Sequence, residues 1–344
     1  MANDFDPNEC PPTDAGIFGL PFSAEEAELV LVPVPWDATT SYRAGTHRGP
    51  GAILTASHQL DLYDIDLGEP WRAGIAMLPP PPQIERLNID ARRDAEKIIA
   101  VGGRISGDKK LAAALASVNE ASLLVNDAVY IAVDQQLKAG KRVGVVGGDH
   151  SVPYGLVKRL AEEHEEFGIL HVDAHADLRD AYEGFDWSHA SIMNNIATRL
   201  PQVTKLVQVG IRDLSKQEAD FITESKGRIV THFDQRLAER KQSGETWAKI
   251  TDSIVADLPK WVYVSFDIDG LDPSFCPHTG TPVPGGLHFH EATSLIRKVV
   301  ESGRTIIGFD LNEVAPGPDG DEWDANVGAR LLYKLCGWCL KSWE

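Results

Sequence analysis

The chain has 344 residues, 43% of them hydrophobic and 24% charged, which is typical of a globular protein. Its formal net charge of −18 argues against nucleic acid or an anionic membrane surface as the main partner, because both are bound through basic patches. No stretch approaches the ~20 apolar residues of a membrane span, and residues 1–12 lack the basic and apolar regions of a signal peptide. We therefore expect a cytoplasmic protein, and its acidity would suit a cationic small molecule.

Short apolar runs alternate with helical patterns along most of the chain. The expected strands cover 28–34, 142–146, 168–172, 206–209, 228–232, 261–266 and 305–311. The expected helices cover 109–139, 153–164, 190–200, 215–225, 236–256 and 289–301, and a further terminal helix carries Cys336 and Cys339 as packing residues. This alternation predicts a parallel sheet with helices on both faces. We expect residues 1–25 to form an N-terminal arm, residues 26–344 a single domain, and Pro79 to Pro82 a stiff surface connector.

Two aspartates and a histidine follow the expected strand at 168–172. Asp173, His175 and Asp177 alternate with alanines, so on an extended strand their side chains would project to one side. Carboxylate oxygen and imidazole nitrogen are suitable donors for a divalent cation. The alternative is a strand end whose acidic side chains are simply solvated.

Two other expected strands end in the same kinds of residue. Gly147-Gly148-Asp149-His150-Ser151 follows one, and Asp267-Ile268-Asp269-Gly270-Leu271-Asp272-Pro273 follows the other, with Asp267 and Asp269 again expected on one face. Open parallel sheets bind ligands beyond the carboxyl ends of their strands, so these residues are candidates for one site. The six candidate ligands are His150, Asp173, His175, Asp177, Asp267 and Asp269. Four convergent carboxylates repel each other unless cations are present, which favours two ions. The absence of thiolates favours Mn²⁺, Ni²⁺, Co²⁺ or Fe²⁺ over Ca²⁺ or a structural zinc.

These three motifs, in this order and spacing, resemble the signatures of the ureohydrolase (arginase/agmatinase) family, most closely its agmatinase-like branch. The resemblance covers most of the chain from about residue 28. It implies a three-layer α/β/α sandwich with a mostly parallel sheet of about eight strands. It also implies two divalent ions, usually manganese, and a homo-oligomer, either trimer or hexamer; the donor set alone leaves nickel as the alternative metal. By this resemblance, His150, Asp173, Asp177 and Asp267 would bind one ion, and Asp173, His175, Asp267 and Asp269 the other.

The chemistry of a guanidino substrate agrees with such a site. A guanidinium stays protonated far above neutral pH, and attack on its carbon needs a strong nucleophile, which a hydroxide bridging two metal ions provides. The resemblance implies that Asp269 takes the proton of this hydroxide, that His189 shuttles protons, and that Glu313 pairs with the guanidinium. Judged without the resemblance, His189 would be a histidine at a helix start and Glu313 a solvated strand-end acid.

The walls of the expected pocket distinguish the substrates. Residues 178–189 are similar to those of agmatinase-type members and lack the asparagine- and serine-bearing loop with which arginases hold an α-amino acid, so arginine is disfavoured. Val283 stands where many relatives have Glu or Ala, and this argues against a partner for the distal ammonium of agmatine in that segment. A bulky wall of Phe185, Trp187, Phe275 and Val283 would suit a shorter substrate. Because residues 178–189 are agmatinase-like, we nevertheless expect agmatine first, then free guanidine, then guanidinobutyrate or guanidinopropionate.

Three other functions agree less well with the sequence. Formiminoglutamate hydrolysis would need a basic cluster at the site, and the sequence offers no obvious one. A non-catalytic, metal-stabilised binding protein would be indicated by the loss of a ligand, of His189 or of Glu313, and all of them are present. A zinc deacetylase of related fold would need a single-metal set of Asp and His ligands, whereas six ligands are found here.

Overall fold

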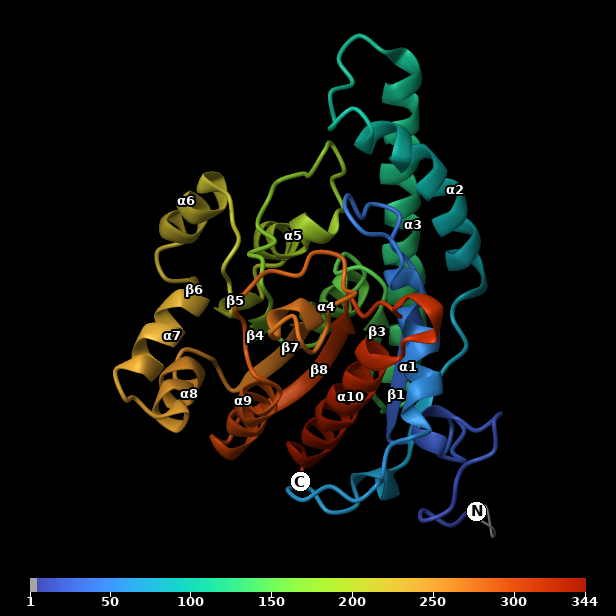
Figure 1. The fold of residues 1–344 in the computed structure, drawn as a ribbon, viewed down its shortest axis with the longest axis vertical. Coiled ribbons are helices and arrows are strands. Elements are labelled where there is room, and N and C mark those ends of the chain that lie inside the picture. The colour runs from blue at the N-terminus through green and yellow to red at the C-terminus, as the bar shows by residue number, and fades with distance from the viewer. Residues whose placement is uncertain (1–4) are drawn as a thin grey trace.

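The computed structural model describes residues 5–344, and they contain one eight-stranded sheet (Figure 1). The strands are β1 (Leu29–Val34), β2 (Ile75–Met77), β3 (Arg142–Gly147), β4 (Phe167–Val172), β5 (Val203–Val209), β6 (Ile229–His232), β7 (Trp261–Asp267) and β8 (Thr305–Asn312). Their order is β2-β1-β3-β8-β7-β4-β5-β6, and every neighbouring pair is parallel. The predicted parallel α/β fold is therefore confirmed.

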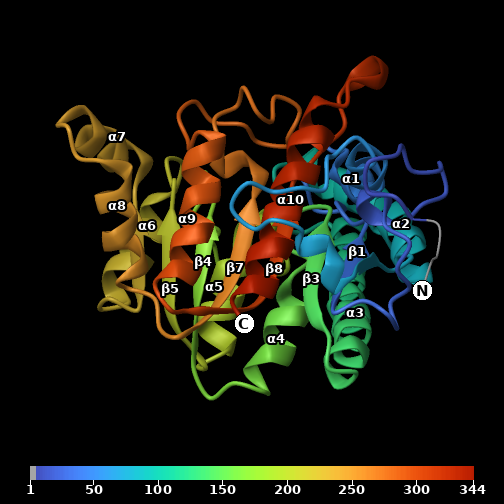
Figure 2. The ribbon, with the colours of Figure 1, turned by 90° about the horizontal axis from the view of Figure 1, so that it is seen from below.

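Helices cover both faces of the sheet, so that the molecule has three layers (Figures 1 and 2). One face is covered by α1 (Gly49–Ser57), α7 (Asp234–Gln242), α8 (Trp247–Val255), α9 (Phe289–Glu301) and α10 (Trp323–Lys341). The other is covered by α3 (Lys109–Lys138), α4 (Tyr154–Ala161), α5 (Ile192–Arg199) and α6 (Lys216–Glu224), with α2 (Pro82–Ile99) packed along α3. Since both faces are buried, successive residues of the central strands enter opposite cores.

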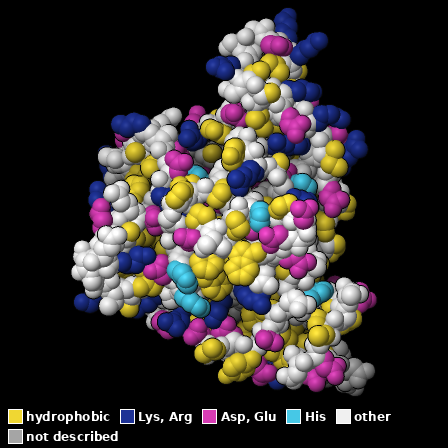
Figure 3. Space-filling view, in the orientation of Figure 1, with side chains coloured by type: hydrophobic (Ala, Val, Ile, Leu, Met, Phe, Trp, Pro, Cys, Tyr) yellow, Lys and Arg dark blue, Asp and Glu magenta, His cyan; other side chains and the backbone are white. Residues whose placement is uncertain are grey.

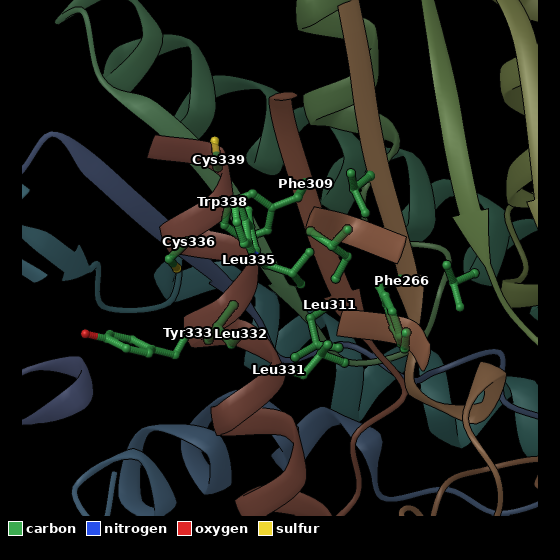
Figure 4. Packing of buried hydrophobic residues seen from close by; sticks show 14 of the residues in the cluster. Phe266, Phe309, Leu311, Leu331, Leu332, Tyr333, Leu335, Cys336, Trp338 and Cys339 are labelled. Atoms are coloured by element: carbon green, nitrogen blue, oxygen red, sulfur yellow. The ribbon is translucent and has the colours of Figure 1, made fainter. Parts of the chain in front are cut away.

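Helix α10 shows how the first of these faces is sealed. Its Leu335 and Trp338 point toward Phe309 and Leu311 of β8 (Figure 4), and all four side chains are buried. Full burial of one such side chain stabilises the fold by about 1.5–3 kcal/mol. Cys336 and Cys339 of the same helix are buried free thiols, which confirms their prediction as packing residues.

Three segments differ from the sequence-based expectation. The N-terminal arm is not purely peripheral, because Ile17 and Leu20 belong to the main core; residues 1–4 lie outside the described residues. The helix predicted at 236–256 is two helices, α7 and α8, because Gly244 takes a positive φ of 85° and Thr246 caps the second one. Strand β2 and helix α2 were not predicted; β2 has only three residues, and Pro82 is the first residue of α2.

The α2–α3 hairpin projects beyond the rest of the fold (Figure 1). Basic side chains gather at its end, whereas acidic and basic side chains are interspersed over the rest of the face shown in Figure 3. No helix within residues 5–344 has both the length and the apolar character that crossing a bilayer requires.

Candidate metal centre

The predicted ligands lie at the carboxyl ends of β3, β7 and β4, and Glu313 follows β8, which lies between β3 and β7 in the sheet. Strands β3, β8, β7 and β4 are neighbours in this order, and the segments that follow them bring the three motifs together. Gly148 makes the approach of the first motif possible, since a Cβ at this position would lie 1.9 Å from the carbonyl oxygen of Trp36. The topology thus places side chains more than a hundred residues apart at one edge of the sheet.

The first cluster is centred on the imidazole of His150. Its Nδ1 lies 3.0 Å from Asp173 Oδ2, 3.3 Å from Asp177 Oδ2 and 3.3 Å from Asp267 Oδ2. Donor atoms that surround one ion at 2.0–2.2 Å are themselves about 3 Å apart. All four side chains are buried. This cluster contains the four residues that were predicted for the first ion, at distances that one ion could span.

The second cluster shares Asp173 with the first. His175 Nδ1 lies 3.1 Å from Asp269 Oδ2 and 3.5 Å from Asp173 Oδ1. Asp173 therefore turns one carboxylate oxygen toward each histidine, as a bridging ligand would. His175 is partly exposed and lines a cavity that opens beside the cluster.

These side chains do not converge by projecting from one face of an extended strand, as the sequence predicted. Strand β4 ends at Val172, so the second motif lies in the loop beyond it, where Asp177 has a left-handed φ of 53°. Asp269 lies in a single turn of 3-10 helix, Ile268–Gly270, and not on an extended strand. Glu313, immediately after β8, also has a positive φ of 63°. Non-glycine residues in this conformation are strained, and such strain is concentrated at functional sites.

The buried carboxylates lie so close together that their negative charges shift one another's pKa values. Burial, together with the negative charges of Asp269 and Asp173, raises the pKa of Asp267 well above its usual range. Burial and the charge of Asp173 raise the pKa of Asp177 to about 6. Burial acts in the same direction on Asp173, but nearby His171 and His150 hold its pKa well below the usual value. Two divalent cations would neutralise the four buried carboxylates of Asp173, Asp177, Asp267 and Asp269, and oxygen and nitrogen donors of this kind fit such ions.

The two other predicted catalytic residues flank the cluster. His189 begins a 3-10 turn, His189–Ser191, and lines the same cavity as His175. Burial, with His175 and His150 nearby, lowers the pKa of His189 to about 4. Glu313 is buried and its Oε1 accepts a hydrogen bond of 3.0 Å from the backbone N–H of His150. Burial and the charge of Asp149 raise the pKa of Glu313 well above normal, so a cationic partner would stabilise it.

Sequence reasoning missed two residues of this region. His171, on β4, is fully buried, and its Nε2 lies 2.8 Å from Asp173 Oδ2. A histidine inside a strand that is buried on both faces is unusual, and this could have marked it in the sequence. Asp213 is exposed and lines the cavity, next to His175 across an isolated parallel bridge. No metal-ligand spacing in the sequence marks Asp213, because tertiary contacts bring the segment that follows β5 beside His175.

The cavity has a volume of about 160 Å³. It is lined by Ser41, His175, Asp177, Arg179, Tyr182, His189, Ala190, Asp213, Leu214, Glu218 and Thr281. The predicted bulky wall was wrong, since none of its four residues is among these described lining residues. Phe185 packs against α2 and α3, Trp187 contacts Tyr154, and Phe275 contacts Phe289. Their hydrophobicity serves the cores and not the cavity.

Known proteins are similar to this chain in both sequence and fold. A sequence model described as the arginase family matches residues 27–337. The N(1)-aminopropylagmatine ureohydrolase of Thermus thermophilus is 33% identical over 314 residues, which cover 91% of this chain and 90% of that protein. The agmatinase of Enterobacter sp. (strain 638) is 31% identical over 326 residues, covering 93% and 91%. The structure of proclavaminate amidino hydrolase from Streptomyces clavuligerus aligns with a TM-score of 0.72 at 24% identity, over 97% of this chain and 100% of that one. The chain therefore belongs to the arginase family and is a hydrolase of the ureohydrolase class.

Proposed function

We propose that this protein cleaves the C–N bond of a small guanidino compound that carries a distal amine, and releases urea and the amine. Agmatine is the first choice of substrate. N(1)-aminopropylagmatine is proposed beside it, because the N(1)-aminopropylagmatine ureohydrolase of Thermus thermophilus is 33% identical to this chain. The observation that supports an amine-bearing substrate is a free carboxylate, Asp213, on the cavity wall beside the proposed metal ligands.

In this proposal, His150, Asp173, Asp177 and Asp267 hold one ion, and Asp173, His175, Asp267 and Asp269 hold the other. When bound, two divalent ions lower the pKa of a water molecule enough to supply a nucleophile near neutral pH. Manganese is the proposed metal and nickel the alternative, because the donors are nitrogen and oxygen without thiolate. A cytoplasmic location and a trimeric or hexameric assembly complete the proposal; both follow from the sequence resemblance and composition alone.

The surrounding side chains have distinct proposed roles. Glu313 would pair with the guanidinium, and this would offset the cost of burying its charge. Asp269, whose Oδ2 accepts a hydrogen bond of 3.3 Å from Thr281, would take the proton of the nucleophile and pass it to the leaving amine. His189 is held neutral by its lowered pKa, so it can accept a proton at the cavity wall.

Asp213 would bind the distal cation of the substrate. Its backbone N–H and that of Arg212 donate to the carbonyl oxygen of Ala174, at 3.0 and 2.8 Å, which anchors it beside the ligand loop. Within residues 5–344 its carboxylate has no ion pair and no hydrogen bond. Arg179, the cationic residue on the same wall, already lies 3.7 Å from Glu218. The wall therefore offers one uncompensated negative charge.

Urea release from a substrate panel tests the class of reaction. Full-length protein reconstituted separately with Mn²⁺ and Ni²⁺ is given agmatine, its N(1)-aminopropyl derivative, guanidine, guanidinobutyrate and arginine. We expect the amine-bearing compounds to have the highest kcat/KM. Absence of urea from all five would refute the proposed function.

The variant Asp213→Asn tests the choice of substrate tail. An exposed ion pair is worth up to about 1 kcal/mol, so kcat/KM for agmatine should fall up to about fivefold. The value for guanidinobutyrate, whose tail is anionic, should rise, and that for guanidine should stay constant. Asp220→Asn, at an exposed acid of α6 paired with Lys216, is the matched control and should change none of them. A uniform change for all substrates would contradict the assignment of Asp213.

Free guanidine is the second candidate substrate. A volume of about 160 Å³ is smaller than the roughly 300–1,000 Å³ of common ligand sites, so the cavity suits a compact molecule. If guanidine has the highest kcat/KM and Asp213→Asn leaves agmatine unaffected, this second candidate replaces the first.

A further inference from the structure

A row of polar side chains crosses the sheet beneath the proposed metal ligands. Asp310, Ser265, His171, Gln208 and Thr231 stand side by side in the registers of β8, β7, β4, β5 and β6. They occupy the face covered by α3, α4 and α5, which elsewhere on these strands carries apolar residues. A parallel sheet buried on both faces normally carries apolar residues throughout, so five polar residues at one level call for a reason.

Hydrogen bonds link the middle of this row to the bridging carboxylate. His171 Nε2 lies 2.8 Å from Asp173 Oδ2. On the other side of the ring, His171 Nδ1 lies 3.0 Å from Gln208 Nε2. The Gln208 amide is in turn fixed at both ends: its Nε2 donates to the carbonyl oxygen of Ala176 at 2.7 Å, and its Oε1 accepts from Thr231 Oγ1 at 3.0 Å.

These contacts define the protonation of the His171 ring. The carbonyl oxygen of Ala176 can only accept, so the Gln208 atom facing it must be the NH₂ group. The same NH₂ group faces His171 Nδ1, which must therefore be the accepting nitrogen. A neutral imidazole with an accepting Nδ1 carries its proton on Nε2. That proton points to Asp173 Oδ2, and Nε2 then has no lone pair with which to bind an ion.

We propose that His171 is a positioning residue for the dinuclear centre: a neutral donor, fixed by Gln208, that holds the carboxylate of Asp173 in its bridging orientation without binding metal itself. This inference rests on the proposed metal assignment. The alternative is that His171 is a ligand, since its ring lies in the cluster with His150, Asp173 and Asp177. The Gln208 contact argues against that alternative, because a ligating Nε2 would require the proton on Nδ1, opposite another donor.

The opposite end of the row supports His150 in a similar way. His150 Nε2 lies 2.8 Å from Ser265 Oγ, and this hydroxyl donates to Asp310 Oδ1 at 3.1 Å. The other ring nitrogen of His150, Nδ1, therefore faces the carboxylates of the cluster and is free to bind an ion. The outer partners of ligands orient them, and their loss commonly reduces metal affinity or activity about 10–100-fold. The row would thus fix Asp173 from one side and His150 from the other.

Metal affinity is the first measurement. Titration of the metal-free, full-length protein with Mn²⁺ gives the affinity and number of bound ions without reference to catalysis. His171→Phe, which removes the donor, should weaken binding by about 10–100-fold, and His171→Gln, which restores an N–H donor, should recover part of it. Gln208→Leu should weaken binding as well and remains informative if His171→Phe does not fold. Thr204→Val, which removes a hydroxyl from β5 outside the row, is the matched control.

The second measurement is the ¹⁵N spectrum of the histidine rings in the metal-free protein, with the His171 signal identified by its loss in His171→Gln. We expect a protonated Nε2 and an unprotonated Nδ1, a pattern that Gln208→Leu should disturb. A ring protonated on Nδ1, or unchanged Mn²⁺ affinity in both His171→Phe and Gln208→Leu, would overturn the proposal. Because neither measurement uses turnover, a protein that binds two ions in this His171-dependent way but releases no urea would refute the proposed function alone.

Discussion

Replacing Asp267 by asparagine should have opposite effects on the metal-free and metal-bound protein. Oxygens of Asp267 and Asp177 both lie 3.3 Å from His150 Nδ1, so they are no more than about twice that distance apart. Two negative charges at roughly 6 Å repel by about 2–3 kcal/mol at an effective dielectric constant of 20. The neutral asparagine side chain would remove this repulsion while keeping nearly the same shape. In the absence of metal, the variant should therefore be more stable than the natural protein.

The pH dependence has a definite sign. The pKa of Asp267 is raised in the folded protein, so its contribution to stability is present below the unfolded value of about 4 and is lost as the pH rises through the raised pKa. The metal-free natural protein should lose stability over that range, and Asp267→Asn should lose less. Once both carboxylates are ionised, a difference of about 2 kcal/mol corresponds to a rise in Tm of roughly 3 °C for a chain of 344 residues.

With metal bound, the natural protein should be more stable than Asp267→Asn. Ions present at a hundred times their Kd stabilise a folded protein by about 2.7 kcal/mol, and a variant that lacks the proposed bridging ligand Asp267 should lose most of this gain. Thermal unfolding with EDTA and over a Mn²⁺ titration, at pH 5 and pH 8, measures both effects. A metal-free Asp267→Asn that melts below the natural protein at pH 8, or an equal Mn²⁺-induced rise in Tm, would show that the electrostatic reasoning is wrong.

Two further changes separate substrate binding from structure. Glu313→Gln keeps an acceptor for the His150 N–H but removes the charge that would pair with the guanidinium; kcat/KM should fall on the order of 10²–10³-fold with the metal content of the protein unchanged, as elemental analysis would check. Loss of metal in this variant would instead make Glu313 part of the ion site. Tyr333→Phe removes a buried 2.6 Å hydrogen bond to the carbonyl oxygen of Leu62, and should lower the free energy of unfolding by about 1–2 kcal/mol in denaturant titrations without affecting kcat/KM. An unchanged midpoint would mean that water replaces the lost hydroxyl.

The sequence by itself determined the parallel α/β architecture and the convergence of the six proposed ligands. Seven of the eight strands were recognisable because a strand buried on both faces is a short apolar run, and because runs alternating with helices require parallel pairing. The ligands converge because residues that follow neighbouring parallel strands meet at one edge of the sheet. Strand β2 escaped recognition because three residues carry too little periodicity for a prediction.

Only the tertiary structure decided how the ligands reach one another and what surrounds them. Asp177 and Asp269 converge through a left-handed residue and a 3-10 turn, conformations that the surrounding packing imposes and that local propensity does not favour. Three of the residues expected to wall the pocket, Phe185, Trp187 and Phe275, pack against other side chains instead, because hydrophobicity alone does not distinguish a cavity lining from a packing surface. The row through His171 and Gln208 depends on the register between strands far apart in sequence. A single sequence does not record that register as a pattern, so the proposed support beneath the candidate metal centre became visible only in the folded protein.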